Sequence, residues 1–151
     1  MSAIIIRAAQ AEDIDTIQAF IRALADYERL AHEVKADRET LGRYLFGPRP
    51  MAEVLIAEAD GSAVGFALFF HNFSTFEGRP GLYLEDLFVE ESQRGRGIGR
   101  RLIDDLIAMG KRDGWTNLYW HTNAENAQAR RLYDSYDKAD GFVRYRLPLR
   151  K

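Results

Sequence analysis

One stretch of the chain combines glycines and arginines at a spacing suited to binding an anion. It reads Arg94-Gly95-Arg96-Gly97-Ile98-Gly99 and follows an apolar run, 81–89, that predicts a strand. Apolar residues recur after Gly97 at helical spacing, so a helix should start there. Glycines let the backbone turn tightly and let a ligand come close. Unpaired amides and the helix dipole make such a helix start positive, which favours a pyrophosphate. Further charge comes from the side chains of Arg94, Arg96, Arg100 and Arg101.

The spacing of these glycines separates the stretch from two common nucleotide motifs. The dinucleotide fingerprint is Gly-x-Gly-x-x-Gly, whereas this chain has Gly95-x-Gly97-x-Gly99. The nucleoside triphosphate loop ends in Gly-Lys-Ser/Thr, and no such triplet follows. Arg94-x-x-Gly97-x-Gly99 fits a third pattern, Gln/Arg-x-x-Gly-x-Gly/Ala. The alternative is a glycine-rich surface turn with solvated arginines.

Composition limits the classes of protein to which the chain could belong. Its 151 residues are 46% hydrophobic and 29% charged, which is typical of one globular domain spanning 1–151. The net charge of −2 argues against a nucleic-acid partner. No cysteine is present, which excludes disulfides, thiolate metal sites and a cysteine nucleophile. We expect no metal site, because the three histidines show no metal-ligand spacing. Without a long apolar run or a signal-type start, a cytoplasmic protein with no membrane partner is expected.

Hydrophobic periodicity predicts the elements that position the glycine stretch. Apolar runs predict strands at 3–8, 52–59, 63–70, 81–89, 117–122 and 142–147. Apolar steps of three and four predict helices from near Asp13 to about Leu30, through Leu41 and Leu45, over 97–110, and over 126–136. Residues 71–80 are predicted to be a loop. This order predicts an α/β (α+β) domain, with a mixed sheet and helices on both faces.

A second motif lies in the last predicted helix, where Asn126 precedes Tyr133 by seven residues. That separation is about two helical turns, so both side chains lie on one face. The string Asn126-Ala127-x-Ala129-Arg130-x-Leu132-Tyr133 and the glycine pattern together resemble the GCN5-related N-acetyltransferases (GNAT superfamily). The element order resembles that family over essentially the whole chain. The resemblance implies a twisted, mostly antiparallel sheet and acetyl-CoA as cosubstrate. The alternative for Tyr133 is a core aromatic residue.

Two further strings narrow the resemblance to a subfamily. Residues 83–89, read with the glycine stretch, look like the spermidine/spermine N1-acetyltransferases, a group that also includes thialysine acetyltransferases. Residues 24–28 of the first predicted helix fit that group as well. The chain departs from the group at Gly141-Phe142, where the group has Gly-Trp, and over residues 33–37. The resemblance therefore implies a small or polyamine-like amine substrate without naming it.

The resemblance also assigns roles to individual residues. It implies that Glu85 is the base that deprotonates the amine and that Tyr133 is the acid beside the thioester sulfur. Tyr27 and Glu28, with Glu85 and Asp86, would hold the cationic substrate. Family members are often homodimers, so a homodimer is expected. Contacts with acetyl-CoA are implied for Leu87, Phe88, Val89, Arg94, Gly95, Arg96, Gly97, Ile98, Gly99, Arg100, Asn126 and Ala129.

The chemistry of amine acetylation is consistent with a carboxylate at Glu85. An alkyl amine with a pKa near about 10.4 is almost wholly protonated at neutral pH, and only its neutral form attacks a thioester. A nearby carboxylate attracts the cation and accepts its proton. Strand alternation should direct Asp86 to the face opposite Glu85 unless a bulge intervenes, which leaves it a supporting role. A backbone N–H of Leu87 or Phe88 is the candidate donor to the oxyanion.

Three functions stay open at this point. The first is an acetyltransferase acting on a small amine. The second is an acetyltransferase acting on a protein lysine or N-terminus, for which a flat groove would be needed. The third is a non-catalytic acyl-CoA sensor, against which the presence of both Glu85 and Tyr133 argues. The sequence names neither the amine nor the acyl chain.

Overall fold

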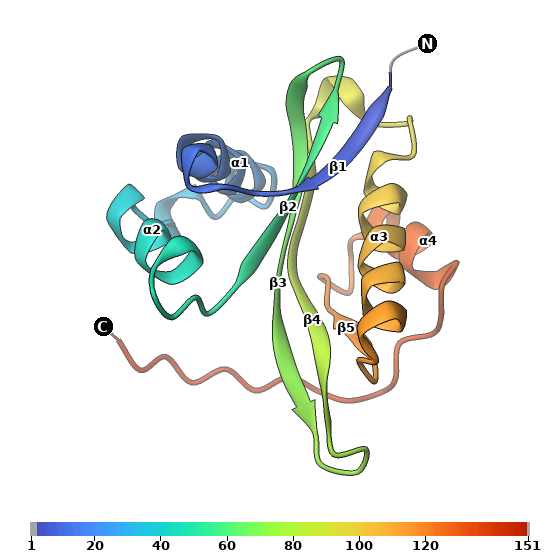
Figure 1. Ribbon diagram of the computed structural model, residues 1–151. Coiled ribbons are helices and arrows are strands. Elements are labelled where there is room, and N and C mark those ends of the chain that lie inside the picture. The colour runs from blue at the N-terminus through green and yellow to red at the C-terminus, as the bar shows by residue number, and fades with distance from the viewer. Residues whose placement is uncertain (1–2, 151) are drawn as a thin grey trace. The chain divides into compact units, whose positions relative to one another are not determined.

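A five-stranded sheet, ordered β1-β2-β3-β4-β5, forms the centre of the first part of the chain (Figure 1). The structure is a computed structural model that describes residues 3–150 and divides into two units, Met1–His121 and Thr122–Lys151. The first three strand pairs are antiparallel and the β4–β5 pair is parallel, which confirms the predicted mixed, mostly antiparallel sheet. The strands are β1 (Ile4–Ala8), β2 (Glu53–Ala59), β3 (Ser62–Ser74), β4 (Arg79–Val89) and β5 (Leu118–Trp120).

Helices cover both faces of this sheet, as predicted. Figure 1 shows α1 and α2 on one face and α3 on the other. The second unit contains one short helix, α4. Among residues 3–150, no helix combines the length and apolar character needed to cross a membrane. The helices are α1 (Ile14–Tyr27), α2 (Arg38–Phe46), α3 (Ile98–Asp113) and α4 (Ala127–Asp134).

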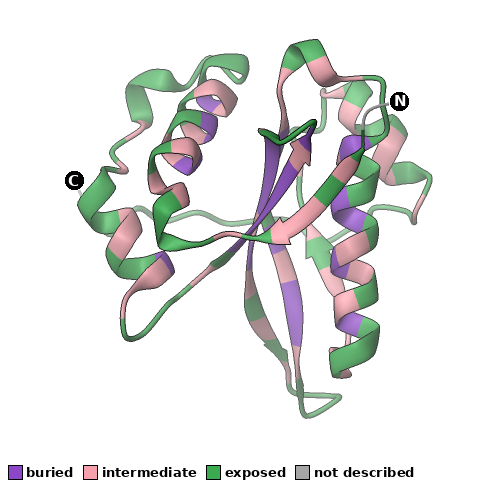
Figure 2. Ribbon diagram, turned by 45° about the horizontal axis from the view of Figure 1, so that its top comes forward, coloured by how far each residue is buried: buried purple, intermediate pink, exposed green. Residues whose placement is uncertain are grey.

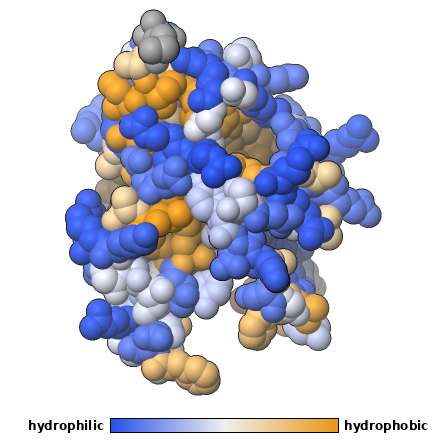
Figure 3. Space-filling view, turned by 90° about the vertical axis from the view of Figure 1, so that its right-hand side faces the viewer, coloured by the Kyte–Doolittle hydropathy of each residue, from blue (hydrophilic) through white to orange (hydrophobic). Residues whose placement is uncertain are grey.

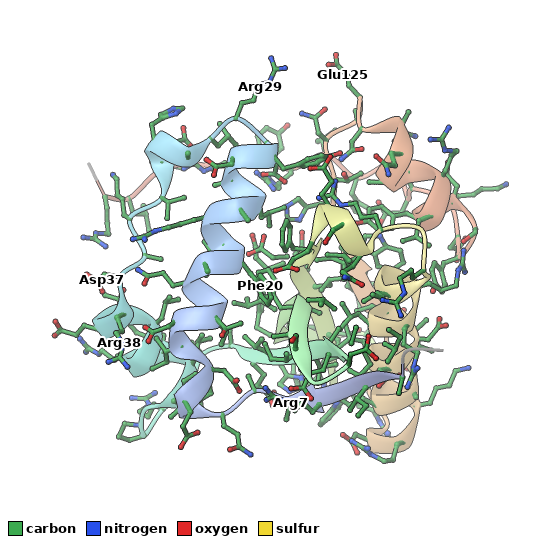
Figure 4. All side chains as sticks on the ribbon, turned by 90° about the horizontal axis from the view of Figure 1, so that it is seen from above. Arg7, Phe20, Arg29, Asp37, Arg38 and Glu125 are labelled. Atoms are coloured by element: carbon green, nitrogen blue, oxygen red, sulfur yellow. The ribbon has the colours of Figure 1, made fainter. Side chains whose placement is uncertain are left out.

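An aromatic cluster fixes α1 against the sheet. The ring centroid of Phe20 lies 5.7 Å from that of Phe66 on β3 and 5.7 Å from that of Phe88 on β4. Figure 4 shows Phe20 directed from α1 toward the sheet. All three side chains are buried. This packing places the C-terminal end of α1, where Tyr27 and Glu28 lie, beside the second half of β4.

The start of α1 is held to the sheet by an ion pair. Arg7 on β1 donates two hydrogen bonds to Asp13, from Nη1 at 2.8 Å and from Nη2 at 2.9 Å. Arg7 is labelled in Figure 4. The hydrogen bond from Arg7 holds the pKa of the Asp13 carboxyl below its usual range. Aromatic packing and a paired charge therefore fix the helix along its length.

The opposite face of the sheet is covered by the apolar stripe of α3. Figure 2 shows buried segments concentrated on the central strands and on the inner sides of α1 and α3. The helix ends at Gly114, which takes a left-handed conformation at φ 77°. The buried residues of the stripe are Ile98, Leu102, Ile103 and Leu106.

A β-bulge interrupts β4 at Glu85. Leu68 on β3 pairs with Asp86, but the next residue, Phe69, pairs with Leu84, so Glu85 is an extra residue. Before the bulge, Leu82 lies against α3, 3.6 Å from where a Cβ on Gly110 would stand. After the bulge, Phe88 packs against α1 instead. The bulge thus interrupts the strict alternation expected around Glu85. Asp86 lies two residues before Phe88, so it is on the same face of the strand as Phe88, the face toward α1.

Two predictions are wrong, one of a loop and one of a strand. Residues 71–80 are not a loop, because β3 continues to Ser74 and β4 starts at Arg79. No strand forms at 142–147, which has no regular secondary structure and is exposed. A strand needs a partner for its backbone groups, and the apolar pattern of the sequence does not say whether one is present.

Candidate active site

The glycine corner forms between β4 and α3 as the sequence predicts. Gly95 and Gly97 have φ of 83° and 76°, in the left-handed region that favours glycine. No atom lies within 4 Å of where a Cβ would stand on either residue, so the space beside the backbone is open. The amides at 98–100 are in the first turn of α3 and cannot be bonded within that helix. The corner therefore offers an accessible set of donors for an anion.

The arginines of the corner differ in their surroundings. Arg96 and Arg100 are exposed, and Arg96 donates a hydrogen bond to the side chain of Gln93. Arg94 is half-buried, and its Nε donates to the carbonyl oxygen of Val89 at 3.0 Å. The corner thus has exposed surface cations beside one arginine that is tied to β4.

Arg94 also connects the corner to α1. Its Cζ atom lies 5.0 Å from the ring centroid of Tyr27 and 6.0 Å from that of Phe88. A guanidinium over an aromatic face at these distances is attracted by the ring electrons. Sequence reasoning assigned Arg94 to phosphate alone, and no signal in the sequence points to this second role. Arg94 joins a predicted cofactor site to a predicted substrate residue.

One edge of β4 is open beside the corner. β5 ends at Trp120, opposite Leu84, so residues 86–89 have no β5 partner on that edge. The same residues pair with β3 on their other edge. Backbone groups on an unpaired edge can bond an extended ligand, although the carbonyl oxygen of Val89 already accepts a hydrogen bond from Arg94. Leu87, Phe88 and Val89, to which the sequence assigned backbone contacts with a cofactor arm, lie in this segment.

Two adjacent acids lie at the bulge in different surroundings. Glu85 is exposed, whereas Asp86 is largely enclosed. Burial chiefly, and then the charges of Glu85 and Glu28, raise the pKa of the Asp86 carboxyl to about 6. These acids interact across two elements, because Glu28 follows α1 while the other two lie on β4. The charges of three predicted substrate residues, Glu28, Glu85 and Asp86, therefore act on one another, and Tyr27 is the residue before Glu28 at the end of α1.

The second motif is formed on α4, in the second unit. Asn126 is the N-cap, and its side-chain oxygen accepts a hydrogen bond from the amide of Ala129 at 3.1 Å. Tyr133 lies in the last turn of the helix. Both residues therefore belong to one short helix, as predicted, and the structure adds a capping role for Asn126. Within residues 3–150, no group of three or more histidine, aspartate or glutamate side chains is arranged to hold a metal ion.

Comparison with known proteins identifies the family. Residues 11–136 match the acetyltransferase (GNAT) family, and the chain belongs to it. The protein is therefore an N-acetyltransferase, and the family uses acetyl-CoA as cosubstrate.

Individual relatives agree with this assignment. Thialysine N-epsilon-acetyltransferase of Bos taurus is 34% identical over 148 residues, covering 93% of this chain and 86% of that protein. The enzyme of the same name from Mus musculus is 32% identical over 154 residues, with coverage of 93% and 90%. An aminoglycoside acetyltransferase from an uncultured soil metagenomic sample, solved in complex with sisomicin, has a TM-score of 0.83 at 17% identity, with 97% of each chain covered. That last similarity concerns the fold alone.

Proposed function

We propose that the protein transfers an acetyl group from acetyl-CoA to the primary amine of a small cationic molecule of the thialysine or polyamine type. The observation that carries this proposal is the group of three acids, Glu28, Glu85 and Asp86, whose charges act on one another between the end of α1 and β4. Neighbouring carboxylates of this kind attract an ammonium ion. The names of the relatives, thialysine acetyltransferases above all, support the same substrate class.

The chain offers suitable groups for the cosubstrate. The amides and arginines of residues 94–100 would hold the pyrophosphate, and the free edge at 87–89 would bond the extended arm. The family resemblance implies that Asn126 and Ala129 also contact this cosubstrate. Bound acetyl-CoA supplies the acetyl group as a thioester. Open space at Gly95 and Gly97 is the structural feature that fits this group.

The chain's own residues would carry the proton transfers. Glu85 accepts a proton from the bound ammonium group, so that the neutral amine can attack the carbonyl carbon. A carbon–nitrogen bond forms and the carbon–sulfur bond breaks, while the amide of Leu87 donates a hydrogen bond to the carbonyl oxygen. The amide of Phe88, the other candidate, is directed toward Phe66 on β3 by the strand register. Tyr133 donates its phenol proton to the departing sulfur. Asp86 and Glu28 keep the substrate cation in place.

Three further expectations belong to this proposal. A homodimer and a cytoplasmic location are expected for a member of this family with this composition. A nucleic-acid partner is not expected, because the net charge is −2. The arginines at the glycine corner would bind the phosphates of the cosubstrate, not those of a nucleic acid.

The proposal is tested by measuring thiol release from acetyl-CoA with a panel of amines. The panel contains spermidine, short diamines, lysine, its thia-analogue and a lysine-bearing peptide. We expect turnover with one or more of the small amines. Turnover with the peptide alone would assign a protein substrate, and tight acetyl-CoA binding without any turnover would indicate a sensor. Failure to bind acetyl-CoA would contradict the assignment of the glycine corner.

Replacing Glu85 by glutamine should shift the pH optimum of turnover upward. Without its base, the enzyme depends on substrate that is already neutral, and that fraction grows as the pH approaches about 10.4. The measurement is kcat against pH with the best amine of the panel. Glu77→Gln, at an exposed site near the β3–β4 turn, is the control for loss of one surface charge. A pH profile identical to that of the unaltered protein would exclude Glu85 as the base.

A further inference from the structure

Arg94 differs from the other arginines of the glycine corner in its surroundings. The others are exposed, namely Arg96, Arg100 and Arg101. Figure 3 shows that hydrophilic side chains cover much of the side of the molecule that carries α3, so an exposed charge there is not distinctive. Arg94 is instead half-buried, with its Nε bonded to Val89 and its guanidinium over the ring of Tyr27. One side chain therefore connects β4, the glycine corner and the end of α1.

The end of α1 carries two residues that we expect to contact the amine, Tyr27 and Glu28. Backbone hydrogen bonds close this end of the helix. The ring of Tyr27 is 48% exposed, so packing alone does not fix its direction. Arg29 has a φ of 61°, a left-handed conformation that is costly for a non-glycine residue and persists only where surrounding contacts hold it. Figure 4 shows its side chain directed away from the molecule, so the contact of Arg94 with Tyr27 is the better candidate for holding this turn.

Electrostatic repulsion acts against this arrangement in the absence of an amine. Glu28 lies near enough to β4 for its charge to act on the carboxyl of Asp86, together with the charge of Glu85. Like charges repel, so these acids push the end of α1 away from the strand. A guanidinium attracts an aromatic face, and the hydrogen bond of Arg94 anchors it to the same strand. Arg94 therefore opposes the repulsion through its contact with Tyr27.

We propose that Arg94 is a positioning residue for the amine substrate, and that its guanidinium holds the ring of Tyr27, and with it Glu28, beside the acids of β4. This role rests on the proposed function and deepens it, because it gives an arginine of the cosubstrate corner a part in amine affinity. Arg94 does not contact the amine in this role. It acts through Tyr27, which together with Glu28 meets the substrate in the proposed site.

A phosphate contact and this role can coexist on one guanidinium. The group has several N–H donors in its plane and a flat face on either side. Among the contacts of residues 3–150, Val89 takes the Nε–H and Tyr27 takes a face, which leaves the Nη donors for an anion. The glycine pattern accepts Gln or Arg at this position. A glutamine keeps N–H donors but has no charge to attract the ring, so Arg94→Gln removes chiefly the positioning role.

Urea unfolding tests the contact without any substrate. Arg94→Gln, Tyr27→Leu and the double variant form a double-mutant cycle, in which residues in contact have non-additive effects. We expect the double variant to raise the unfolding equilibrium constant about fivefold less than the product of the two single effects. Tyr44 on α2, 46% exposed against 48% for Tyr27, gives the matched control. The effects of Tyr44→Leu and Arg94→Gln should simply multiply.

Binding of thialysine, the thia-analogue of lysine, tests the role in amine affinity. Calorimetry on protein saturated with CoA, which has no acetyl group to transfer, measures this affinity without turnover. Arg94→Gln should weaken it about tenfold in the otherwise unaltered chain and less than about twofold in Tyr27→Leu. At saturating acetyl-CoA, KM for thialysine should rise about tenfold and kcat should stay within about twofold. Arg43→Gln, which removes a cation from the ring of Tyr44, is the control and should change neither.

The outcomes separate failure of this role from failure of the proposed function. Weaker acetyl-CoA binding with unchanged thialysine affinity would give Arg94 a phosphate role only, and lower stability with unchanged affinity would make it a structural residue. Multiplying unfolding effects of Arg94→Gln and Tyr27→Leu, in a protein that turns over small amines, would likewise overturn the positioning role alone. If the unaltered protein bound no thialysine while the unfolding effects stayed coupled, the proposed substrate class and the role of Arg94 would be rejected together.

Discussion

Tyr133→Phe is expected to lower kcat about 100-fold or more, in line with the contribution of general acid catalysis. The substitution removes the phenol proton and keeps the ring. Loss of the proton donor affects the departure of sulfur, which occurs in the chemical step. Binding of acetyl-CoA, which uses the glycine corner and the free edge of β4 in the proposed mechanism, should stay within about twofold of its original strength.

The two quantities are measured separately, kcat by thiol release and affinity by calorimetry with acetyl-CoA. Tyr136→Phe is the matched control, since it removes a phenol from the residue three positions further along the chain. It should leave both quantities close to their original values. Loss of acetyl-CoA affinity in Tyr133→Phe would make Tyr133 a binding or structural residue rather than the acid.

Local patterns were sufficient to predict most of the elements. The apolar steps from Ile14 to Tyr27 match α1, and those from Ile98 to Leu106 match α3. Glycines at 97 and 114 mark both ends of α3, where their left-handed conformations are observed. Such signals lie within the residues that form each element, because helix formation depends on contacts three and four residues apart.

Features that depend on distant parts of the chain were not predictable in this way. The extension of β3 to Ser74 carries polar residues because it runs beyond the core, so hydrophobicity does not reveal it. The bulge at Glu85 depends on the register with Leu68 and Phe69 of another strand. The predicted strand at 142–147 has no regular secondary structure, although its sequence favours a strand. Pairing is a property of two segments, and each sequence pattern describes only one.

The candidate site also contains local features that the sequence predicts and long-range features that it does not. The glycine corner was predicted in place, because its spacing is a local property. The position of Arg94 over Tyr27 joins two segments that are far apart in sequence, and no local pattern indicates it. The sequence assigned Asp86 only a supporting role, because strand alternation placed it opposite Glu85, whereas its partial burial depends on the bulge and on the packing of α1.

Asp86→Asn is expected to stabilise the fold above about pH 6 while lowering turnover. The carboxyl has a pKa raised from 3.8 to about 6, chiefly by burial and then by the charges of Glu85 and Glu28. Because its pKa is higher in the folded state than in the unfolded state, the folded protein binds more protons in this window. The free energy of unfolding therefore falls as the pH rises from about 4 to about 6. Asp86→Asn has no carboxyl and should not show this decrease.

At about pH 8, Asp86→Asn is expected to raise the free energy of unfolding by about 2 kcal/mol. This is less than the full pKa difference would give, because the side chain is partly exposed. At about pH 4 the two proteins should be equally stable, since both then carry a neutral group. Urea unfolding at the two pH values measures the difference. Asp26→Asn, at an exposed position near the end of α1, is the control and should show no change of this size with pH.

The same variant should bind the substrate cation less tightly, because the amide carries no charge. A stabilising substitution that raises KM for the amine would show that the enclosed charge is kept for function at the expense of stability. A variant that is less stable at both pH values would instead make Asp86 a structural partner within the bulge, and the cation site would then rest on Glu28 and Glu85.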